Sequence, residues 1–428
     1  MASGDHPEAQ SVISAQAARP LRIMFLYMFP LWGNGSGAWL RALAAEMVKD
    51  GHSVAIVAPE KRKLPGVKHY NVPVPQMGVF VGNPELPGAK RYQDMNGVEL
   101  GKVYTSYIDA TLRAVKEYQP EIIHVFHTAY LPGVARLAKI LYGIRFIVTT
   151  HGSDLHYLTQ DGRLIGLIKD ALHVSAAITA NSAFTRRWFL KMFGAEWDRK
   201  LRTIPGGVYA ADYVRDEAKS KLIDEKYGLK DKKVVLFTGR LTIHKGVEYL
   251  IKAAQTIKGE VIILGDGPER KRLERLIKHY KLTNCRILGY MKPGEQLGFR
   301  AFYGRADVYV APSTWKEPLG LVILEAMAAK TPVISTRAGG VTSLIKDGYN
   351  GFLVHARNAT EISSRVNQLL ASDELREKMA ERSYELVIKK YTWGRIAESF
   401  ERMYEKYASS TSEYLKLVKK QPKNHTGK

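Results

Sequence analysis

The sequence predicts an α/β protein made of two doubly wound parallel sheets in tandem. Short apolar segments bounded by Gly or Pro alternate with segments of helical periodicity, which is typical of parallel strands covered on both faces by helices. This alternation stops once, over a charged segment near residues 210–232 that is expected to be a linker, and then starts again. The length of 428 residues accommodates two domains of ordinary size.

The first series of elements follows residues 1–20, which mix Ser, Ala, Gln and Pro without a period and are expected to form a mobile tail. Continuous apolar runs predict strands at 21–29, 53–59, 122–127, 145–150, 177–181 and 201–205. Apolar residues at helical spacing predict helices at 37–49, 131–141, 164–173 and 184–193. Residues 64–96 carry several Pro and Gly, and an irregular excursion is expected there.

The second series repeats the pattern. Strands are predicted at 234–238, 261–264, 286–288, 308–311, 333–335 and 351–354. Helices are predicted at 246–257, 269–282, 295–305 and 318–330, and the chain is helical from 359 to about 407. The prediction is therefore a first domain at 21–209, a second at 210–390, a C-terminal helical segment at 391–410 and a polar, Lys-rich tail at 411–428.

Composition narrows the class of protein and of partner. With 64 Lys+Arg against 42 Asp+Glu, the net charge is +22, so nucleic acid, an anionic membrane surface and a phosphorylated substrate are all candidate partners. The single cysteine, Cys285, excludes a disulfide scaffold and fits a reducing cytoplasm. The most apolar stretch, 23–32, is too short to span a bilayer. Acidic residues and no Lys or Arg in the first ten positions argue against a secretory signal.

Ligands of open parallel sheets bind at the carboxyl ends of the strands, and the first such loop is rich in glycine. Gly33, Gly35, Ser36 and Gly37 precede a predicted helix, where free backbone N–H groups and the helix dipole favour a phosphate. The spacing also fits a loose dinucleotide fingerprint with Glu60 as its acidic residue. A phosphate- or substrate-facing loop, a dinucleotide site and a merely structural turn remain open.

A second candidate lies after the strand at 145–150, where His151 and Asp154 flank Gly152. A histidine and an acid at a strand's carboxyl end form a candidate polar site. His124 and His127 lie in or just after the preceding strand, so one of them could face the same cleft. The alternative for each of these two is a hydrogen-bonded core histidine.

The second series offers two cations and two acids. Arg240 and Lys245 flank a strand-to-helix turn and could converge on a diphosphate; otherwise they are solvated surface cations. Glu317 precedes an apolar helix that contains Glu325, and a carboxylate among Leu, Val, Ile and Met is costly to bury without a partner. Sugar or ribose hydroxyls would satisfy these carboxylates, and so would a basic side chain.

These residues together resemble a known family. The E-x7-E spacing of Glu317 and Glu325, with Arg240 and Lys245, is similar to the nucleotide-sugar site of family 4 glycosyltransferases. Supporting motifs are T-H-G-S-D at 150–154, A-N-S at 180–182, I-P-G-G-V at 204–208 and L-G-D-G-P at 264–268. The resemblance implies a GT-B fold, in which two Rossmann-like domains face each other across a cleft and the C-terminal helix crosses back to the first domain.

The resemblance also implies a reaction. It is the retaining transfer of a sugar from a nucleotide-diphosphate sugar, UDP-sugar first and GDP-mannose next, to a glycan, lipid-linked or small-molecule acceptor. No cofactor is implied, and no metal is needed for the chemical step; the sequence has no D-x-D pair. Leu319 stands where the family usually has Phe, and Lys330 where it often has Gly, which leaves the identity of the donor open.

Roles for single residues follow from the same resemblance. Arg240 and Lys245 would bind the donor diphosphate and stabilise the leaving group, Glu325 the ribose and Glu317 the transferred sugar. His151 would place its side chain on the donor sugar and its carbonyl near the anomeric carbon. Further donor contacts are expected at Tyr290 and Met291, which would frame the base, and at Leu319, Gly320 and Leu321. The loop of Gly33, Gly35, Ser36 and Gly37 would close over the phosphate and acceptor region, with His127 and Asp154 as candidates on the acceptor side.

Three other functions compete with transfer: a nonhydrolysing sugar epimerase on a similar fold, a basic nucleic-acid-binding protein, and a Rossmann oxidoreductase. No nucleic-acid module is visible, so no nucleic acid partner is expected.

The segment 182–197 suggests a cytoplasmic enzyme peripheral at the inner face of the membrane, because cations and aromatic residues share one short helix. They are Arg186, Arg187 and Lys191 with Trp188, Phe189 and Phe193. The alternative is that these aromatic residues pack in the core.

Overall fold

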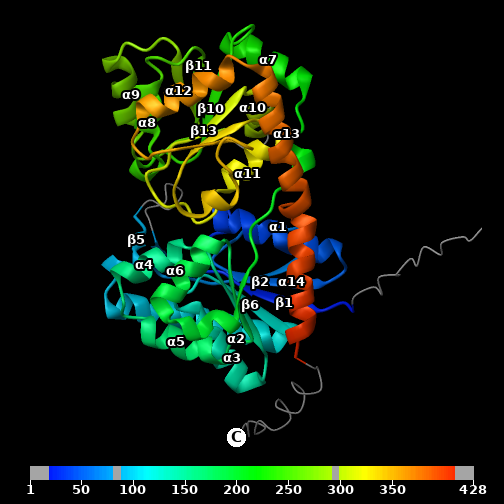
Figure 1. The fold of residues 1–428 in the computed structure, drawn as a ribbon. Coiled ribbons are helices and arrows are strands. Elements are labelled where there is room, and N and C mark those ends of the chain that lie inside the picture. Colours follow the sequence, from blue (N-terminus) through cyan, green and yellow to red (C-terminus); the bar gives the residue numbers. More distant parts are fainter. Residues whose placement is uncertain (1–18, 81–87, 292–297, 410–428) are drawn as a thin grey trace, which may run out of the picture.

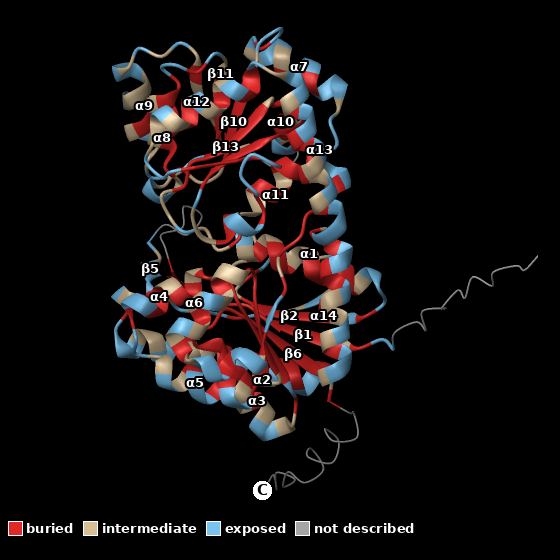
Figure 2. Ribbon diagram, viewed as in Figure 1, coloured by how far each residue is buried: buried red, intermediate tan, exposed pale blue. Residues whose placement is uncertain are grey.

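The computed structural model describes residues 19–80, 88–291 and 298–409, which form two α/β domains, one above the other (Figure 1). The first domain holds a parallel sheet of order β3-β2-β1-β6-β7-β8-β9, and the second a parallel sheet of order β12-β11-β10-β13-β14-β15. Both sheets are buried between helices (Figure 2). The predicted class of two doubly wound sheets is confirmed.

The elements of the first domain follow the predicted alternation closely. In chain order they are β1 Arg22–Leu26, α1 Gly35–Lys49, β2 Ser53–Ala58, β3 Val67–Asn71, β4 Gly78–Val79, β5 Lys90–Arg91, η1 Tyr92–Asp94, α2 Gly97–Tyr118, β6 Ile122–Phe126, α3 Leu131–Tyr142, β7 Phe146–Thr150, α4 Ser153–Gln160, α5 Ile165–Val174, β8 Ala177–Ala180, α6 Ala183–Phe193, η2 Ala195–Arg199 and β9 Leu201–Thr203.

The rest of the chain repeats the alternation and ends in three helices. Its elements are η3 Ala210–Tyr213, α7 Glu217–Tyr227, β10 Val234–Thr238, η4 Ile243–Lys245, α8 Val247–Ala253, β11 Glu260–Leu264, α9 Arg270–His279, β12 Cys285–Gly289, α10 Phe299–Arg305, β13 Val308–Ala311, α11 Leu321–Ala328, β14 Val333–Thr336, η5 Gly339–Ser343, β15 Phe352–Val354, α12 Ala359–Leu370, α13 Asp373–Lys390 and α14 Trp393–Tyr407.

The structure departs from the sequence prediction in several places, and helices α2 and α4 lie where the sequence prediction names no helix. The expected irregular excursion at 64–96 contains β3, an edge strand paired in parallel with β2. The expected linker at 210–232 contains η3 and the charged helix α7. The helix predicted at 318–330 begins only at Leu321, because Gly320 has a left-handed φ of 92° that helical geometry does not allow. Most of the two predicted tails lies outside the described residues, as does the start of the helix predicted at 295–305.

The C-terminal helix α14 packs on the first domain, continuing the line of α13 along one side of the molecule (Figure 1). Its Trp393 and Phe400 contact Trp39 of α1, with ring centroids 5.6 Å and 5.3 Å apart. Its Tyr404 hydroxyl lies 2.6 Å from Nδ1 of His124, whose Nε2 lies 2.6 Å from the Thr149 hydroxyl. His124 is therefore a hydrogen-bonded core residue, the simpler of the two interpretations above.

Helix α6 does not offer the aromatic face that the membrane hypothesis requires. Phe189 and Phe193 are buried in the first core, and Trp188 lies 6.4 Å from Trp315 of the second domain. Arg186 is paired with Asp198 at 2.5 Å. The aromatic half of that hypothesis is wrong, because core and interdomain packing already use these rings. Among the helices of the described chain, none is long and apolar enough to cross a bilayer.

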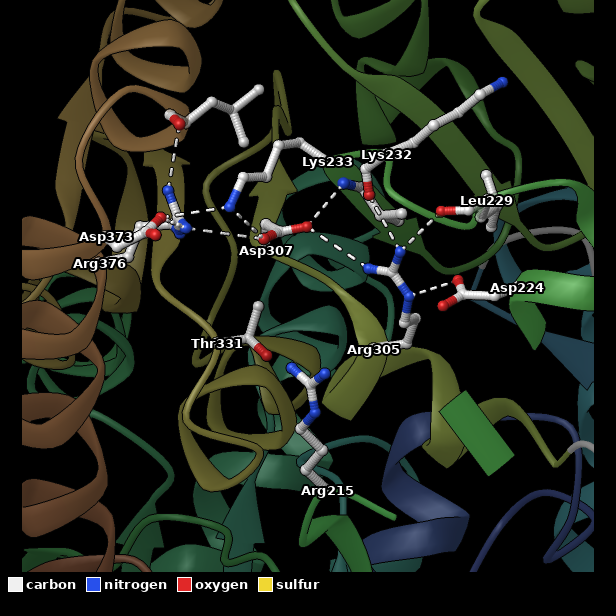
Figure 3. Close-up of polar contacts among 12 residues, drawn as sticks. Arg215, Asp224, Leu229, Lys232, Lys233, Arg305, Asp307, Thr331, Asp373 and Arg376 are labelled. Carbon is white, nitrogen blue, oxygen red and sulfur yellow. Dashed lines mark hydrogen bonds and ion pairs between the residues drawn. The ribbon is translucent and has the colours of Figure 1, made fainter. Parts of the chain in front are cut away.

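An ionic network lies at the edge of the second sheet where its strands begin (Figure 3). Arg305 is buried and donates to Asp224 at 2.5 Å and to the carbonyls of Leu229 and Lys232 at 2.9 Å and 3.0 Å. Asp307 accepts the Val234 amide at 2.8 Å and lies 3.5 Å from Arg305. These contacts fix α7 and its following turn against β10 and β13.

We expect Arg305→Ala to lower the free energy of unfolding of the second domain by about 3–5 kcal/mol, because it leaves partly buried carboxylates and carbonyls without a donor. Calorimetric unfolding would show the corresponding transition at lower temperature. The control is Arg215→Ala, which breaks an exposed pair with Glu217 and should cost less than about 1 kcal/mol. Equal losses in the two variants would contradict the role given to the network.

Candidate functional site

The glycine loop between β1 and α1 is shaped by its own polar side chains. Asn34 caps α1, and its Oδ1 accepts the Gly37 amide at 2.7 Å and the Tyr27 hydroxyl at 2.6 Å. The Ser36 hydroxyl lies 2.8 Å from that of Tyr27. A Cβ at Gly37 would lie 2.3 Å from the Leu31 carbonyl oxygen, so only glycine fits there. The loop is preformed at the helix N-terminus, where an anion is favoured.

Two further glycines complete the loop: Gly33 has a left-handed φ of 79°, and Gly35 borders open space. Glu60, the acid of the dinucleotide alternative, is buried and accepts the Leu31 amide at 3.1 Å and Nε of Arg62 at 3.0 Å. Its oxygens are therefore engaged in holding this loop. That arrangement argues against a ribose contact by Glu60 and against the oxidoreductase alternative.

His127 follows β6 and lies against the glycine loop. Its Nε2 is 3.1 Å from the Ser36 hydroxyl, and its ring centroid is 4.7 Å from that of His151. Burial and the neighbouring His151 hold the pKa of His127 well below its usual range. Its backbone is left-handed at φ 75°, and Nδ1 has no hydrogen-bond partner within the described residues. The structure thus brings His127, His151 and the glycine loop together.

Asp154 is a structural anchor rather than an open acceptor-side group. Its buried carboxylate accepts four backbone N–H groups, three of them from the strand-to-helix loops that carry His127 and His151. The donors are Thr128 at 2.6 Å, Gly152 at 2.7 Å, and His151 and Leu155 at 3.1 Å each. The expectation that Asp154 faces the acceptor is therefore corrected: it fixes the loops that do carry site residues.

His151 is buried among aromatic rings, and the next residue, Gly152, lies against the second domain. It stacks on Phe126 at 5.2 Å, and its carbonyl accepts Nδ2 of Asn181 at 3.1 Å. Its Nε2 has no partner among the described residues. Burial lowers the pKa of His151 to about 4, although nearby Asp154 raises it, so the imidazole is neutral at physiological pH. A Cβ on Gly152 would lie 2.5 Å from Pro318 of the second domain.

The second domain brings Lys245 and Glu317 together. Nζ of Lys245 lies 2.5 Å from Oε1 of Glu317, which also accepts the Ser313 hydroxyl at 2.9 Å. Arg240, at the end of β10, has no acidic partner among the described residues, and its buried Nε makes no hydrogen bond there. Burial lowers the pKa of Arg240. Arg240 is thus a partly desolvated cation whose charge is not compensated by protein carboxylates.

Glu325, on α11, is half-buried, and the Tyr303 hydroxyl donates to its Oε2 at 2.6 Å. Burial raises the pKa of Glu325, while hydrogen bonds from Tyr303 and Tyr213 lower it. Leu319 is buried and Gly320 caps α11. Leu321 packs against the hydrophobic cores of both domains, so it lies where the domains meet.

The predicted base-framing residues follow β12. Tyr290 is 64% exposed, whereas Met291 packs partly into the second core. Electrostatic coupling of Tyr290 to Arg41 of α1 places it near the first domain. Across the described residues, no group of three His, Cys, Asp or Glu side chains is arranged to hold a metal ion.

Sequence reasoning missed several residues of this region. Trp315 lies 4.5 Å from the ring of His156 in the first domain and 5.7 Å from that of His244. The Ser182 hydroxyl donates to the Pro318 carbonyl across the domain boundary at 2.5 Å. Tyr303 and Tyr213 contact Glu325. Ser182 ends the A-N-S motif, but its contact with Pro318 was not predicted. The other residues carry no local pattern that marks them, and only tertiary packing brings them to the site.

Comparison with known proteins gives matches along most of the chain. The family model described as Glycosyltransferase Family 4 matches residues 33–211, and that described as Glycosyl transferases group 1 matches residues 219–386. An uncharacterized glycosyltransferase of Methanocaldococcus jannaschii is 28% identical over 309 residues, covering 68% of this chain and 86% of that protein.

Two solved structures are similar in fold. Sucrose-phosphate synthase of Thermosynechococcus elongatus has a TM-score of 0.74 at 21% identity, covering 90% of this chain and 98% of that one. HepE of Anabaena, in complex with UDP and glucose, has a TM-score of 0.71 at 18% identity, covering 90% and 100%. Both likenesses concern the arrangement of the two domains.

The buried neutral His151 predicts acid sensitivity of the fold. The unfolded chain takes up this proton near pH 6.5, whereas the folded pKa of His151 is about 4. Stability contributed by neutral His151 should therefore be complete above pH 6.5 and fall by up to about 3 kcal/mol as the pH drops toward 4. His151→Gln should flatten the dependence of melting temperature on pH between these values. An unchanged slope in that variant would contradict the assignment.

Proposed function

Because the chain belongs to the family 4 glycosyltransferases, with a GT-B fold and a nucleotide-sugar donor, we propose that it transfers a hexose with retention of anomeric configuration. The acceptor would be a sugar, a glycan or a lipid-linked acceptor. The observation that carries this proposal is the contact between the Gly152 and Pro318 loops, which sets His151 and Glu317 next to one boundary between the domains. The epimerase and nucleic-acid alternatives are not favoured by the comparisons.

The cations of the second domain would carry the charge that develops on the leaving diphosphate. Arg240 lacks a protein carboxylate partner in the described chain, so a diphosphate would supply the missing counter-charge. Lys245 is held by Glu317. On donor binding, Lys245 would turn to the phosphate and Glu317 would accept hydroxyls of the transferred sugar. Cations fixed before the reaction stabilise the transition state without reorganisation, and this supports a chemical step without metal.

His151 would act as a neutral hydrogen-bonding group rather than as an acid. The anomeric C–O bond to the diphosphate breaks, a bond to the acceptor oxygen forms on the same face of the sugar, and the acceptor proton leaves with the diphosphate. Asn181 holds the His151 carbonyl, and Asp154 holds its amide. These bonds would keep the first-domain side of the cleft rigid while the donor sugar reacts.

For the donor, a UDP-sugar is proposed first and GDP-mannose second. The complex of HepE with UDP and glucose supports the first choice. A GDP-mannose-dependent phosphatidylinositol monomannoside mannosyltransferase of Mycolicibacterium smegmatis, 26% identical over 365 residues, supports the second. Buried, unpaired Cys285 supports a cytoplasmic site of action.

A hydrolysis and transfer screen over UDP-, GDP- and ADP-sugars tests the proposal. We expect one donor class to respond, activity to persist in EDTA, and the product to keep the anomeric configuration of the donor by NMR. Arg240→Ala and Lys245→Ala should each reduce transfer by at least about a hundredfold, since each removes a charge that stabilises the leaving group. Lys271→Ala, an exposed cation of α9, is the matched control. Undiminished turnover in the Arg240 or Lys245 variant would refute the donor site.

We also propose that the enzyme is peripheral at the inner face of the membrane through charge alone. Arg187 and Lys191 are exposed on α6, and each such cation contributes about 1 kcal/mol at an anionic surface. Sedimentation with anionic vesicles should show salt-sensitive binding that weakens about tenfold or more in Arg187→Ser/Lys191→Ser. The equivalent pair on α9, Lys271→Ser/Arg275→Ser, removes the same charge as a control. Wild-type protein that ignores anionic vesicles at low salt would end this hypothesis.

A further inference from the structure

The carboxylate of Glu325 lies next to two tyrosines that belong to other elements. Tyr303 of α10 is fully buried, and its hydroxyl lies 2.6 Å from Oε2 of Glu325. Tyr213 of η3 is also buried, and it lies close enough to the same carboxylate to lower the pKa of Glu325. The two tyrosine rings meet edge to face at 5.5 Å. Neither ring belongs to the strand-end loops that carry the other candidate residues.

The hydroxyl groups behind Glu325 form a chain with a defined direction. An ionised carboxylate only accepts hydrogen bonds, so Tyr303 must donate to it. The Tyr303 oxygen, 2.5 Å from the Thr238 hydroxyl, then accepts from Thr238. Thr238 ends β10, two residues before Arg240, and its carbonyl accepts the Tyr309 hydroxyl at 3.3 Å. The chain therefore connects Glu325 with the strand that presents Arg240.

Tyr213 brings the segment between the two domains into this network. The residue lies in η3, which directly follows the crossing at Val208. Arg300 of α10 lies 5.6 Å from the Tyr213 ring centroid and pairs with Asp212 at 2.8 Å. The interdomain segment is thus fastened to α10 on one side and contacts Glu325 on the other.

The hydroxyl groups around Glu325 affect its charge, because burial disfavours the ionised carboxylate. Burial raises the pKa of Glu325, and the Tyr303 and Tyr213 hydroxyls and the charge of Arg300 act against this. Tyr309 also lies within electrostatic range. An ionised carboxylate has both oxygens free to accept hydrogen bonds from the two hydroxyls of a ribose. In the protonated form, one oxygen carries a proton and acts as a donor. The Tyr303 and Tyr213 hydroxyls favour the ionised form of Glu325 and fix its orientation.

We propose that Tyr303 and Tyr213 are positioning residues for the donor, which hold Glu325 ionised and aimed at the ribose hydroxyls. The inference rests on the proposed function and on the role that the family resemblance implies for Glu325, which is to bind the ribose of the donor. It adds that the segment between the domains supplies part of the donor pocket. Recognition of the ribose then depends on three elements, α10, α11 and η3, of which only α11 carries a glutamate of the E-x7-E pair.

Calorimetric titration with two ligands tests the inference. The first is whichever of UDP, GDP and ADP binds the wild-type protein most tightly, and the second is its 2′,3′-dideoxy analogue. We expect Tyr303→Phe and Tyr213→Phe each to weaken the ribonucleotide about three- to tenfold, and to leave the dideoxy analogue unchanged. A merely structural loss would weaken both ligands equally. Tyr92→Phe removes a buried hydroxyl that pairs with Tyr130 in the first domain and serves as the control.

The pH dependence gives a second readout. Loss of a tyrosine donor raises the pKa of Glu325, so in Tyr303→Phe the weakening of ribonucleotide binding on acidification should begin at a higher pH than in the wild type. The nucleotide itself also titrates, but this affects both proteins equally and cancels when their pH profiles are compared. Equal weakening of both nucleotides, or no weakening, in both tyrosine variants would overturn the inference. If Glu325→Gln also binds the ribonucleotide normally, or wild-type protein binds no nucleotide, the proposed function fails instead.

Discussion

The arrangement of the two domains depends on one place where the chain crosses between them twice. Outgoing Val208 donates to the Tyr391 carbonyl at 2.8 Å, and returning Trp393 donates to the Val208 carbonyl at 3.3 Å. A Cβ at Gly207 would lie 3.0 Å from the Trp393 nitrogen, and one at Gly206 would lie 2.5 Å from the Trp39 ring. The two glycines permit this close approach, which holds the loops of both domains opposite each other.

The site that results from this constraint combines satisfied and unsatisfied polar groups. The Asp154 carboxylate is satisfied by backbone N–H groups, and Lys245 and Glu317 are paired with each other. Arg240, Nδ1 of His127 and Nε2 of His151 have no such partner in the described chain. Buried polar groups without partners are costly in a finished core, and here they gather where substrate is proposed to bind. Rigidity comes from the first group, and affinity for a charged, hydroxyl-rich ligand from the second.

Local sequence was sufficient for the elements whose burial is uniform: β10 and β13 have the predicted bounds because all their residues are apolar or buried. It failed for β3, whose residues alternate between exposed and buried at a sheet edge, and for α7, whose charged surface conceals the helix capped by Asp216. Motifs indicated the glycine loop, His151 and the charged residues of the second domain as candidate site residues. They could not reveal the four backbone donors of Asp154 or the tyrosines behind Glu325, because such partners are distant in sequence.

The packing of α14 on the first sheet has a consequence for biosynthesis. Trp39 and Phe126 are made early, but Trp393 and Phe400, which pack on Trp39, are made only after the second domain. Throughout translation of the second domain, the nascent first domain exposes an apolar surface, which favours chaperone binding over release. A message truncated near codon 390 would yield a polypeptide with both sheets complete and one face uncovered, a substrate for quality-control proteases.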